Sequence, residues 1–403
     1  MKASWLLIIS CCWGLTLQAQ VNNVDTLTNQ PLNSASNIIA GNSSKNITLG
    51  AYAEMDYNQP FAKDVHRTGN LDVHRLVLFM GYQFSQNTHF VTEIEFEHIK
   101  EVYVEQAFIN HRINNALSFR GGLMLVPMGI INEYHEPTTY NGVERPNLDG
   151  KIIPSTWREL GLGVTGTLPA ASLRYQAYLF NGFNGYDQGV GMLRGNDALR
   201  AGRQKGAESY MSSPNFSAKI DHFGVLGLKI GLAGYFGKSQ STLFEQLDKN
   251  NSLLRAHADS SVVGISMVGL DARYQKGGFQ ARGQLVNAQL NNTDQYNGLT
   301  GRDLGAQLFG YYLEVGYDLL RPFELKSKQR LVLFSRYEKY NTHKVMLGEG
   351  MTNAAFDRTD ITTGFSYHIA YGAVIKLDYQ RFQNADQNNM DQHQINTGLG
   401  IWF

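Results

Sequence analysis

The sequence predicts an all-β protein: a transmembrane antiparallel β-barrel of about 16 strands, with short periplasmic turns and long extracellular loops. Three observations predict this fold. From Asn46 onward, stretches of roughly ten residues alternate apolar and polar side chains, as strands with one apolar and one polar face do. Short connections alternate with long ones between these stretches, which is typical of such barrels. No apolar run reaches the roughly 18 residues that a membrane-spanning helix needs.

The first residues have the features of an export signal. A basic residue precedes the apolar run "WLLIISCCWGLTL", and Ala19 is a small residue before a cleavage site. We expect residues 1–19 to be a signal peptide cleaved near Ala19, and the polar residues 20–45 to be a periplasmic N-terminal arm. The alternative is a lipoprotein signal ending at Cys11. Because Cys11 and Cys12 both lie in this segment, the mature chain would have no disulfide and no thiolate metal site.

The barrel is expected over residues 46–403. The strand candidates are centred near residues 52, 79, 94, 106, 120, 163, 177, 218, 231, 268, 283, 312, 335, 365, 378 and 398. Connections are short after the second, fourth, sixth and eighth candidates and long after the fifth, seventh and ninth. The alternative is a soluble β-sandwich or propeller, whose connections would not sort into short and long in this way.

The last strand candidate reaches the final residue. Its apolar face is formed by Ile395, Leu399, Ile401 and Phe403. Such a strand needs a partner, because an open edge leaves backbone groups unpaired. We expect it to pair with the first candidate, residues 46–57, and so to close the barrel. A terminal Phe also resembles the signal read by the outer-membrane barrel-assembly machinery, so Phe403 is the expected contact.

Barrels of about 16 strands enclose a water-filled channel, so we expect the polar strand faces to line it. The candidates for pore-lining charged side chains are Arg75, Glu93, Glu95, Glu97, Arg120, Arg174, Lys229, Arg273, Arg282, Arg336 and Lys376. Acidic and basic residues nearly balance on these faces, which favours weak selectivity or a polar neutral solute. For each residue the alternative is a pair with an opposite charge across the strands.

One connection, residues 127–155, is too long for a passive link. We expect it to fold into the pore as a constriction loop; the alternative is a loop that stands outward. Its charged candidates are Glu133, Glu136, Glu144, Arg145, Asp149 and Lys151. Within "EYHEP", Glu133, His135 and Glu136 form only a weak metal motif, and the histidines show no zinc spacing. We therefore expect no metal and no cofactor.

Two motifs resemble those of the phosphate-selective porin O and P family. "GLMLVPMG" is similar to the family's G-x-F-K-x-P-x-G segment, where strand five enters the constriction loop, and it matches at Gly122, Pro127 and Gly129. "LRYQAYLFNG" is similar to the family's strand seven, and Arg145 lies where the family often has a loop arginine. The resemblance implies a trimeric outer-membrane channel. Because Leu125 replaces the family's usual Lys, it implies a porin without phosphate specificity.

Together these features predict an outer-membrane porin of a Gram-negative bacterium. It would form a channel for passive diffusion of small solutes or ions, with weak or anion-leaning selectivity and no enzymatic activity. The expected partners are outer-membrane lipid, the assembly machinery, the permeating solutes and further copies in a homotrimer. Nucleic acid is not expected, since 35 basic residues balance 35 acidic ones. The alternatives are a barrel hydrolase using Ser366 and His368, or a loop-mediated binding or adhesion protein.

Overall fold

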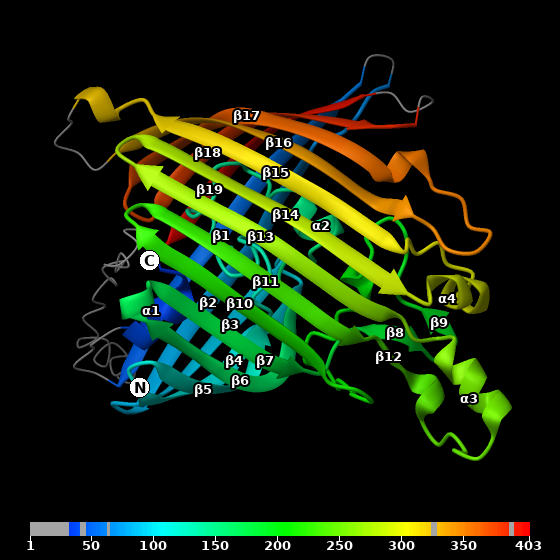
Figure 1. The fold of residues 1–403 in the computed structure, drawn as a ribbon. Coiled ribbons are helices and arrows are strands. Elements are labelled where there is room, and N and C mark those ends of the chain that lie inside the picture. The colour runs from blue at the N-terminus through cyan, green and yellow to red at the C-terminus, as the bar shows by residue number, and fades with distance from the viewer. Residues whose placement is uncertain (1–31, 41–45, 63–64, 324–328, 387–390) are drawn as a thin grey trace, which may run out of the picture.

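The chain forms a closed antiparallel β-barrel of 16 strands (Figure 1). The computed structural model describes residues 32–40, 46–62, 65–323, 329–386 and 391–403, so the expected signal peptide, residues 1–19, lies outside the described residues. The barrel strands are β1 (Ile47–Phe61), β2 (Asn70–Ser85), β3 (Thr88–Glu97), β4 (Glu101–Asn114), β5 (Leu117–Leu125), β6 (Arg158–Leu168), β7 (Leu173–Phe180), β10 (Asn215–Val225), β11 (Leu228–Lys238), β13 (Gly264–Lys276), β14 (Phe279–Asn291), β15 (Gln307–Asp318), β16 (Arg330–Val345), β17 (Asp357–Ala370), β18 (Ala373–Asn384) and β19 (Gln392–Trp402). Each predicted strand centre falls inside one of them, so the predicted fold is confirmed.

The first and last strands form the seam that closes the barrel. Strands β1 and β19 pair from Tyr52 opposite Trp402 to Phe61 opposite His393. The backbone of Phe403 continues this pairing, since its N–H and carbonyl both bond to Ala51 at 2.9 Å. The predicted pairing of the first and last strands is therefore confirmed, and neither strand is left with an open edge.

The strands turn their apolar side chains outward, the reverse of a water-soluble protein. On β15, Tyr311, Leu313 and Val315 are exposed, while the alternate residues Tyr312 and Glu314 are buried on the inner side. This alternation follows directly from the period of two along a strand. An apolar outer surface around a polar interior is what a barrel embedded in lipid presents. None of the described helices is long and apolar enough to cross a membrane.

The two ends of the barrel differ (Figure 1). At one end, the turn end, two-residue connections such as 226–227 and 277–278 join most neighbouring strands. At the other, the loop end, the connections include residues 126–157, 181–214 and 239–263. One connection at the loop end departs from this rule, because only residues 98–100 join β3 to β4.

The long loops carry short elements of their own. A small sheet is formed by β8 (Asn184–Asp187), β9 (Val190–Gly191) and β12 (Gln240–Ser241), and the loop helices are α2 (Leu148–Lys151), α3 (Ser252–Asp259) and α4 (Thr293–Thr300). Single 3₁₀ turns are η1 (Pro169–Ala171), η2 (Arg200–Gly202), η3 (Thr242–Phe244), η4 (Arg321–Phe323) and η5 (Ala354–Phe356). These elements gather mainly at the loop end, beyond the barrel wall (Figure 1).

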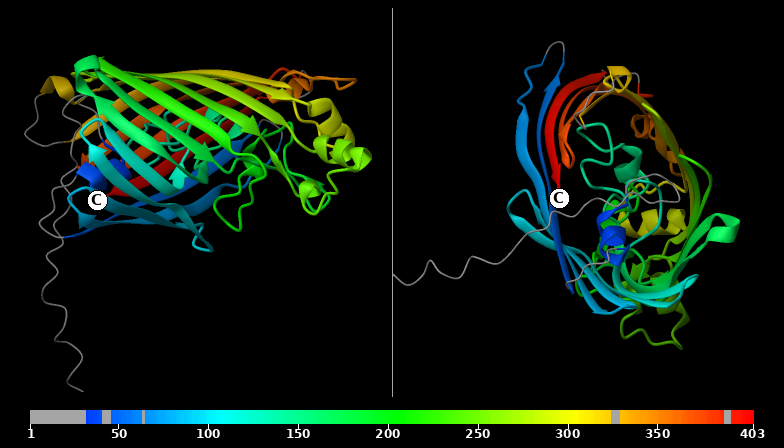
Figure 2. Two further views of the ribbon diagram at one scale, coloured as in Figure 1. Left: turned by 60° about the horizontal axis from the view of Figure 1, so that its bottom comes forward. Right: turned by 90° about the vertical axis from the view of Figure 1, so that its left-hand side faces the viewer.

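Helix α1 (Ser34–Ala40) lies inside the barrel (Figure 2). Its Ile38 is buried in one cluster with Val77 and Phe79 of the wall. Ser34 donates hydrogen bonds from its backbone N–H and its hydroxyl to one carboxylate oxygen of Glu136, at 2.6 and 2.8 Å. Residues 34–40, part of the arm expected over residues 20–45, therefore form a helix whose apolar side is buried against the inner wall.

Candidate functional site

The connection from β5 to β6, residues 126–157, crosses the lumen; we call it the inward loop. None of its residues is exposed. It reaches the far wall, where the Val143 N–H donates to Asp378 of β18 at 2.6 Å and the Leu148 N–H donates to Glu338 of β16 at 3.1 Å. The loop expected over residues 127–155 therefore does lie inside the barrel rather than standing outward.

A polar clasp holds the two ends of the inward loop together. The Asn132 side-chain amide donates to the carbonyls of Val126 and Trp157, at 2.7 and 2.9 Å, and its oxygen accepts from the Trp157 N–H at 2.7 Å. The Trp157 ring packs against Phe183 and Tyr235, with centroids 4.7 and 4.6 Å apart. The loop thus leaves and rejoins the wall at a rigid, buried neck.

Basic side chains of the wall donate to backbone carbonyls of the inward loop. These contacts run from Arg75 to His135, from Lys219 to Gly129, from Arg282 to Thr139, from Arg336 to Glu144 and from Lys376 to Gly142. A loop without regular structure has carbonyls that need donors when buried. The wall cations supply those donors, so they hold the loop as well as contributing charge to the lumen.

The predicted lining residues all lie on the inner face of the wall, but their side chains differ in exposure to solvent. Arg75, Glu93, Glu95, Lys229, Arg336 and Lys376 are buried, whereas Glu97, Arg120, Arg174, Arg273 and Arg282 are partly exposed. Many are paired: Arg336 lies 3.3 Å from Glu314 and 2.9 Å from Glu338, and Glu314 lies 3.0 Å from Arg282. That these residues line a conducting pore remains a prediction.

The acidic ladder of β3 is divided between two surroundings. Glu95 lies 4.0 Å from Arg75, whose guanidinium is also 3.1 Å from Glu54. Glu97 is opposite Arg75 in the strand register and is partly exposed. Glu93 lies deeper, 3.8 Å from His135 of the inward loop. The loop and the neighbouring strand therefore offset the repulsion expected among the three carboxylates.

The predicted charged residues of the inward loop divide into two sets: Glu144, Arg145, Asp149 and Lys151 line one cavity, whereas Glu133 and Glu136 lie outside it. Glu133 pairs with Lys219 at 2.7 Å, while Glu136 accepts from Ser34 of α1. Glu144 accepts from Asn58 at 2.9 Å. The three residues of the "EYHEP" motif are thus separated, since Glu133 faces away from His135 and Glu136.

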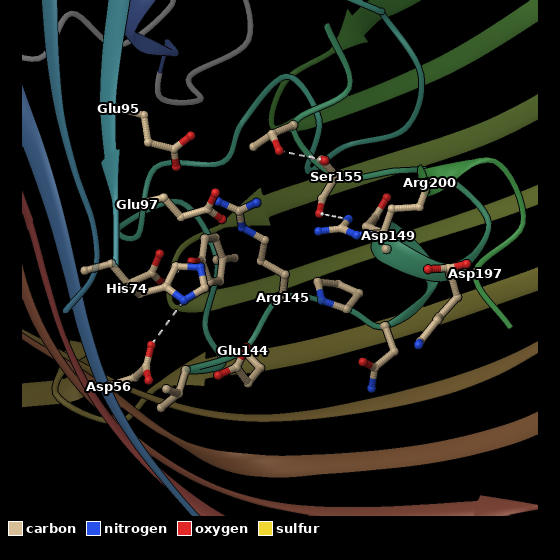
Figure 3. A pocket seen from close by; sticks show the side chains of 18 residues that line it. Asp56, His74, Glu95, Glu97, Glu144, Arg145, Asp149, Ser155, Asp197 and Arg200 are labelled. Atoms are coloured by element: carbon tan, nitrogen blue, oxygen red, sulfur yellow. Dashed lines mark hydrogen bonds and ion pairs between the residues drawn. The ribbon is translucent and has the colours of Figure 1, made fainter. Parts of the chain in front are cut away.

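Within the part of the chain that the structure describes, one chamber of the lumen lies toward each end of the barrel. The loop-side chamber, of about 310 Å³, is bounded by the inward loop and by the parts of β1, β2 and β3 nearer the loop end (Figure 3). Its charged lining comprises Glu54, Asp56, Glu95, Glu97, Glu144, Asp149, Asp197, His74, Arg145, Lys151 and Arg200. Burial raises the pKa of the Asp149 carboxyl to about 7, although Gln284 donates a hydrogen bond to it at 2.9 Å.

The turn-side chamber has the same volume, about 310 Å³, and a different lining. Helix α1 forms one side, and strands β4 to β7 form much of the rest. Its charged lining comprises Arg112, Arg120, Arg174, Lys229, Glu133 and Asp221. Three of the predicted basic lining residues therefore meet here, and the side chains of α1 narrow the space between them.

Glu105 and Tyr52 are lumen residues that the sequence reasoning missed. In the β3–β4 register, Glu93 pairs with Gln106 and Ile94 pairs with Val104, so Glu105 is an extra, bulged residue. The bulge buries Glu105 and Gln106 on the same inner side, against the strict alternation used to assign faces. Tyr52 lies two residues before Glu54 on the same face of β1, so the alternation alone could have predicted that it faces the lumen.

The residues named for a hydrolase lie on β17. Ser366 is buried and donates its hydroxyl proton to the Asn141 carbonyl of the inward loop. His368 is also buried, two residues further along the same strand face. Ser366 thus serves as another contact between the wall and the loop.

No family model matches the chain. An uncharacterized protein of Aquifex aeolicus (strain VF5) is 30% identical over 359 residues, which are 86% of this chain and 78% of that protein. The chain belongs to the family of this Aquifex protein. The shared stretch is long enough to include most of the barrel, so the architecture described above is that of the Aquifex-protein family.

Solved structures share the fold at much lower identity. OmpF of Salmonella typhi, solved in complex with daunomycin, matches with a TM-score of 0.56 and 12% identity, over 89% of this chain and 97% of that one. An anion-selective porin from Comamonas acidovorans gives 0.54 and 12%, over 89% and 99%. The outer-membrane channel DcaP of Acinetobacter baumannii gives 0.54 and 11%, over 89% and 97%. The chain therefore has the fold of the outer-membrane porins.

Proposed function

We propose that this protein is an outer-membrane channel through which small polar solutes or ions diffuse passively. The observation that carries the proposal is the barrel itself: a closed wall that is apolar outside and charged inside, crossed by a loop that leaves a polar chamber on each side. Such a wall suits a membrane, and a polar lumen suits hydrated solutes. The porins of the same fold support this function.

The selectivity that we propose is weak. The loop-side chamber is lined by more carboxylates than basic groups, and the turn-side chamber by more basic groups than carboxylates. Opposite charges in series oppose each other's preference for one ion. This arrangement gives less support to the anion-leaning selectivity expected from the sequence than to a channel with little net preference.

The motifs shared with the porin O and P family are explained by architecture. Gly122 has φ +136°, and a Cβ there would lie 2.3 Å from the Ala107 carbonyl oxygen. Gly129 has φ +75°, and a Cβ there would lie 2.7 Å from the Gln284 side chain. Gly122 lies within β5, where a side chain would clash with β4, and Gly129 lies in the inward loop, close to Gln284 of β14. They support a porin with an inward loop and give no support to phosphate specificity.

The same proposal sets the protein's surroundings. The apolar belt would contact outer-membrane lipid, with the turn end in the periplasm and the loop end outside. Phe403 would be read by the barrel-assembly machinery, and three copies would form the trimer that the porin resemblance implies. Export by the signal of residues 1–19, with cleavage near Ala19, belongs to the same proposal.

The test is electrical. Purified protein added to a planar lipid bilayer should give stepwise increases in conductance, and the reversal potential in a KCl gradient should lie close to zero. Insertion without conductance would contradict the channel. A reversal potential near the limit for one ion would contradict weak selectivity while leaving the channel itself intact.

A further inference from the structure

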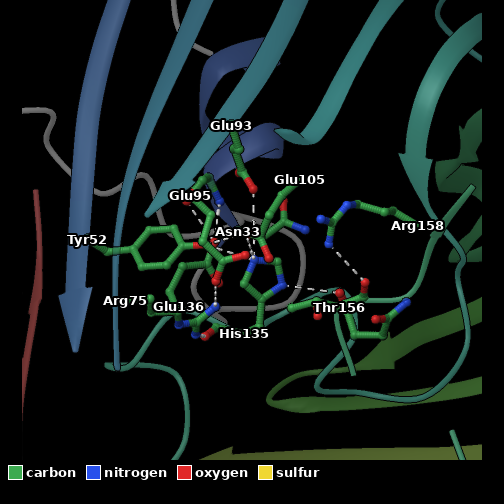
Figure 4. Close-up of polar contacts among 12 residues, drawn as sticks. Asn33, Tyr52, Arg75, Glu93, Glu95, Glu105, His135, Glu136, Thr156 and Arg158 are labelled. Atoms are coloured by element: carbon green, nitrogen blue, oxygen red, sulfur yellow. Dashed lines mark hydrogen bonds and ion pairs between the residues drawn. The ribbon is translucent and has the colours of Figure 1, made fainter. Parts of the chain in front are cut away.

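A cluster of acidic side chains surrounds one histidine where the inward loop meets the wall (Figure 4). Glu93 comes from β3, Glu105 from β4 and His135 from the loop, and all three are buried. One possible ligand atom from each lies within 4.8 Å of the others. Such atoms are separated by about 3.3–3.4 Å when they surround Zn²⁺ tetrahedrally at about 2.0–2.1 Å. His135 Nε2 lies 3.4 Å from Glu105 Oε2 and 3.8 Å from Glu93 Oε2.

The imidazole is oriented as a metal ligand. His135 Nδ1 lies 3.2 Å from the Asn132 carbonyl oxygen, and because a carbonyl can only accept, Nδ1 carries the proton. Nε2 faces the two carboxylates and the Tyr52 hydroxyl oxygen, and a metal ion bound there would take the place of a proton on Nε2. A histidine that binds metal commonly donates its other N–H to a carbonyl in this way. Asn132 also forms the clasp of the loop, so the ring is held by a rigid segment.

Three carboxylate oxygens around His135 have no hydrogen-bond partner. Glu93 Oε2, Glu105 Oε1 and Glu136 Oε2 are buried without a hydrogen-bond partner. Tyr52 has one hydroxyl proton, which it donates to Glu105 at 3.0 Å, although it also lies 2.9 Å from His135 Nε2. Buried carboxylate oxygens without a hydrogen-bond partner are costly. A cation among these atoms would satisfy the oxygens and the imidazole together.

The nearby guanidinium groups contact other residues, although Arg75 Nη1 and Arg158 Nε are buried without a hydrogen-bond partner. Arg75 is paired with Glu54 at 3.1 Å and donates to the His135 carbonyl. Arg158 donates to the Thr156 carbonyl at 3.4 Å and lies over the Tyr103 ring. The β-bulge in β4 also favours a binding site, because it turns the Glu105 side chain into the lumen. Bulges often direct a side chain into a site.

We propose that Glu93, Glu105 and His135 bind one divalent metal ion of the first transition row, with Zn²⁺ as the best match. Two carboxylates and an imidazole are hard and borderline ligands, which suit Zn²⁺ or Mn²⁺ better than Mg²⁺ or Cu⁺. The ion would join two strands of the wall to the inward loop. Its role is structural: it fixes the loop across the lumen, whether or not solutes pass.

A second group of possible ligands lies at the rim and provides a control. Asp72, His74 and His98 have ligand atoms within 4.8 Å of one another, but these residues are half-buried or exposed. Asp72 is already paired with His98, and His74 lies 3.6 Å from Asp56. His74→Gln removes an imidazole from the rim group and leaves the buried cluster intact.

The test uses the full-length protein in detergent, stripped with a chelator and then titrated with ZnCl₂ by calorimetry. We expect one tight site per chain. Glu105→Gln and His135→Gln should weaken that site by at least about tenfold. Glu97→Gln, the same change on β3 outside the cluster, and His74→Gln should leave it unchanged. Each variant is first shown to keep its β-sheet circular dichroism.

Co²⁺ binding provides a readout that needs no variant. If the cluster holds the metal, Co²⁺ added to the wild-type protein should give the intense visible absorption of a tetrahedral site, and Zn²⁺ should displace it. Three results would overturn the proposal: no tight site in the wild-type protein, an unchanged site in both Glu105→Gln and His135→Gln, or loss of the site in His74→Gln alone.

Discussion

The two chambers have equal volume and opposite charge. The loop-side chamber sets seven carboxylates against three lysine or arginine side chains, whereas the turn-side chamber sets two carboxylates against four. The chain as a whole has no net charge, so this difference arises from how the fold distributes its residues. The order of charges along the lumen, rather than their sum, would therefore decide what an ion meets in the proposed channel.

The inward loop is the partition that keeps the chambers distinct, and Arg336 is its most buried support. Arg336→Met would leave Glu338 buried without its guanidinium partner and Glu314 with Arg282 alone, which should cost about 3–5 kcal/mol of stability. The loop would also lose a donor to the Glu144 carbonyl, so the chambers should merge and conductance should rise. Thermal unfolding in detergent and single-channel recording measure the two effects.

Arg381→Met is the matched control for that change. Arg381 pairs with Asp391, but both side chains are more than a third exposed, at 41% and 34%. Its loss should cost at most about 1 kcal/mol and leave conductance unchanged. Equal destabilisation by the two variants would show that the partition does not depend on the buried ion pairs.

Removal of α1 should widen the turn-side chamber alone. Deletion of residues 32–40 takes away the helix that forms one side of that chamber, so the unitary conductance should increase while the barrel stays folded. A variant with these residues replaced by a Gly/Ser segment of equal length controls for chain length. Unchanged conductance in both would mean that α1 does not limit the passage of ions.

The opposed charges should make the current depend on the sign of the voltage. When the loop side is positive, cations enter through the acidic chamber and anions through the basic one, so both accumulate at the inward loop and the current is larger. Glu97→Gln and Arg120→Gln should each reduce this rectification, from opposite ends of the lumen. They should shift the reversal potential in opposite directions; shifts in the same direction would contradict the comparison.

The smallest expected effect concerns pH. Burial in the inward loop raises the pKa of Asp149 to about 7, against about 3.9 in water. With the inward loop packed in the lumen, Asp149 stays protonated at pH values where it would ionise if the loop were exposed to water. The stability of the packed loop should therefore fall as pH rises from about 4 to about 7, then level off. Open-channel current noise should rise over that range, and the rise should disappear in Asp149→Asn.

The strands were predictable because their signal is local. Alternating side chains and turn residues located the barrel strands, and the same parity placed Arg75 and Arg336 on the inner face. The contacts of the lumen were not predictable, because they join distant residues, as Lys376 and Gly142 do. The inward position of Glu105 was not predictable because a bulge interrupts the alternation of β4. Helix α1 was not predictable because its seven residues are too few to show a helical period.

The seam between β1 and β19 also bears on how the molecule forms. Residues 52 and 402 become neighbours only at this junction, so the first and last strands must meet before the barrel is closed. Hairpins pair strands that are consecutive in the sequence, whereas the closing contact joins strands far apart in it, and loop-closure entropy makes that contact the slowest to form. Folding intermediates should therefore be curved open sheets. Their two edge strands, β1 and β19, would remain free to bind another protein until they pair with each other.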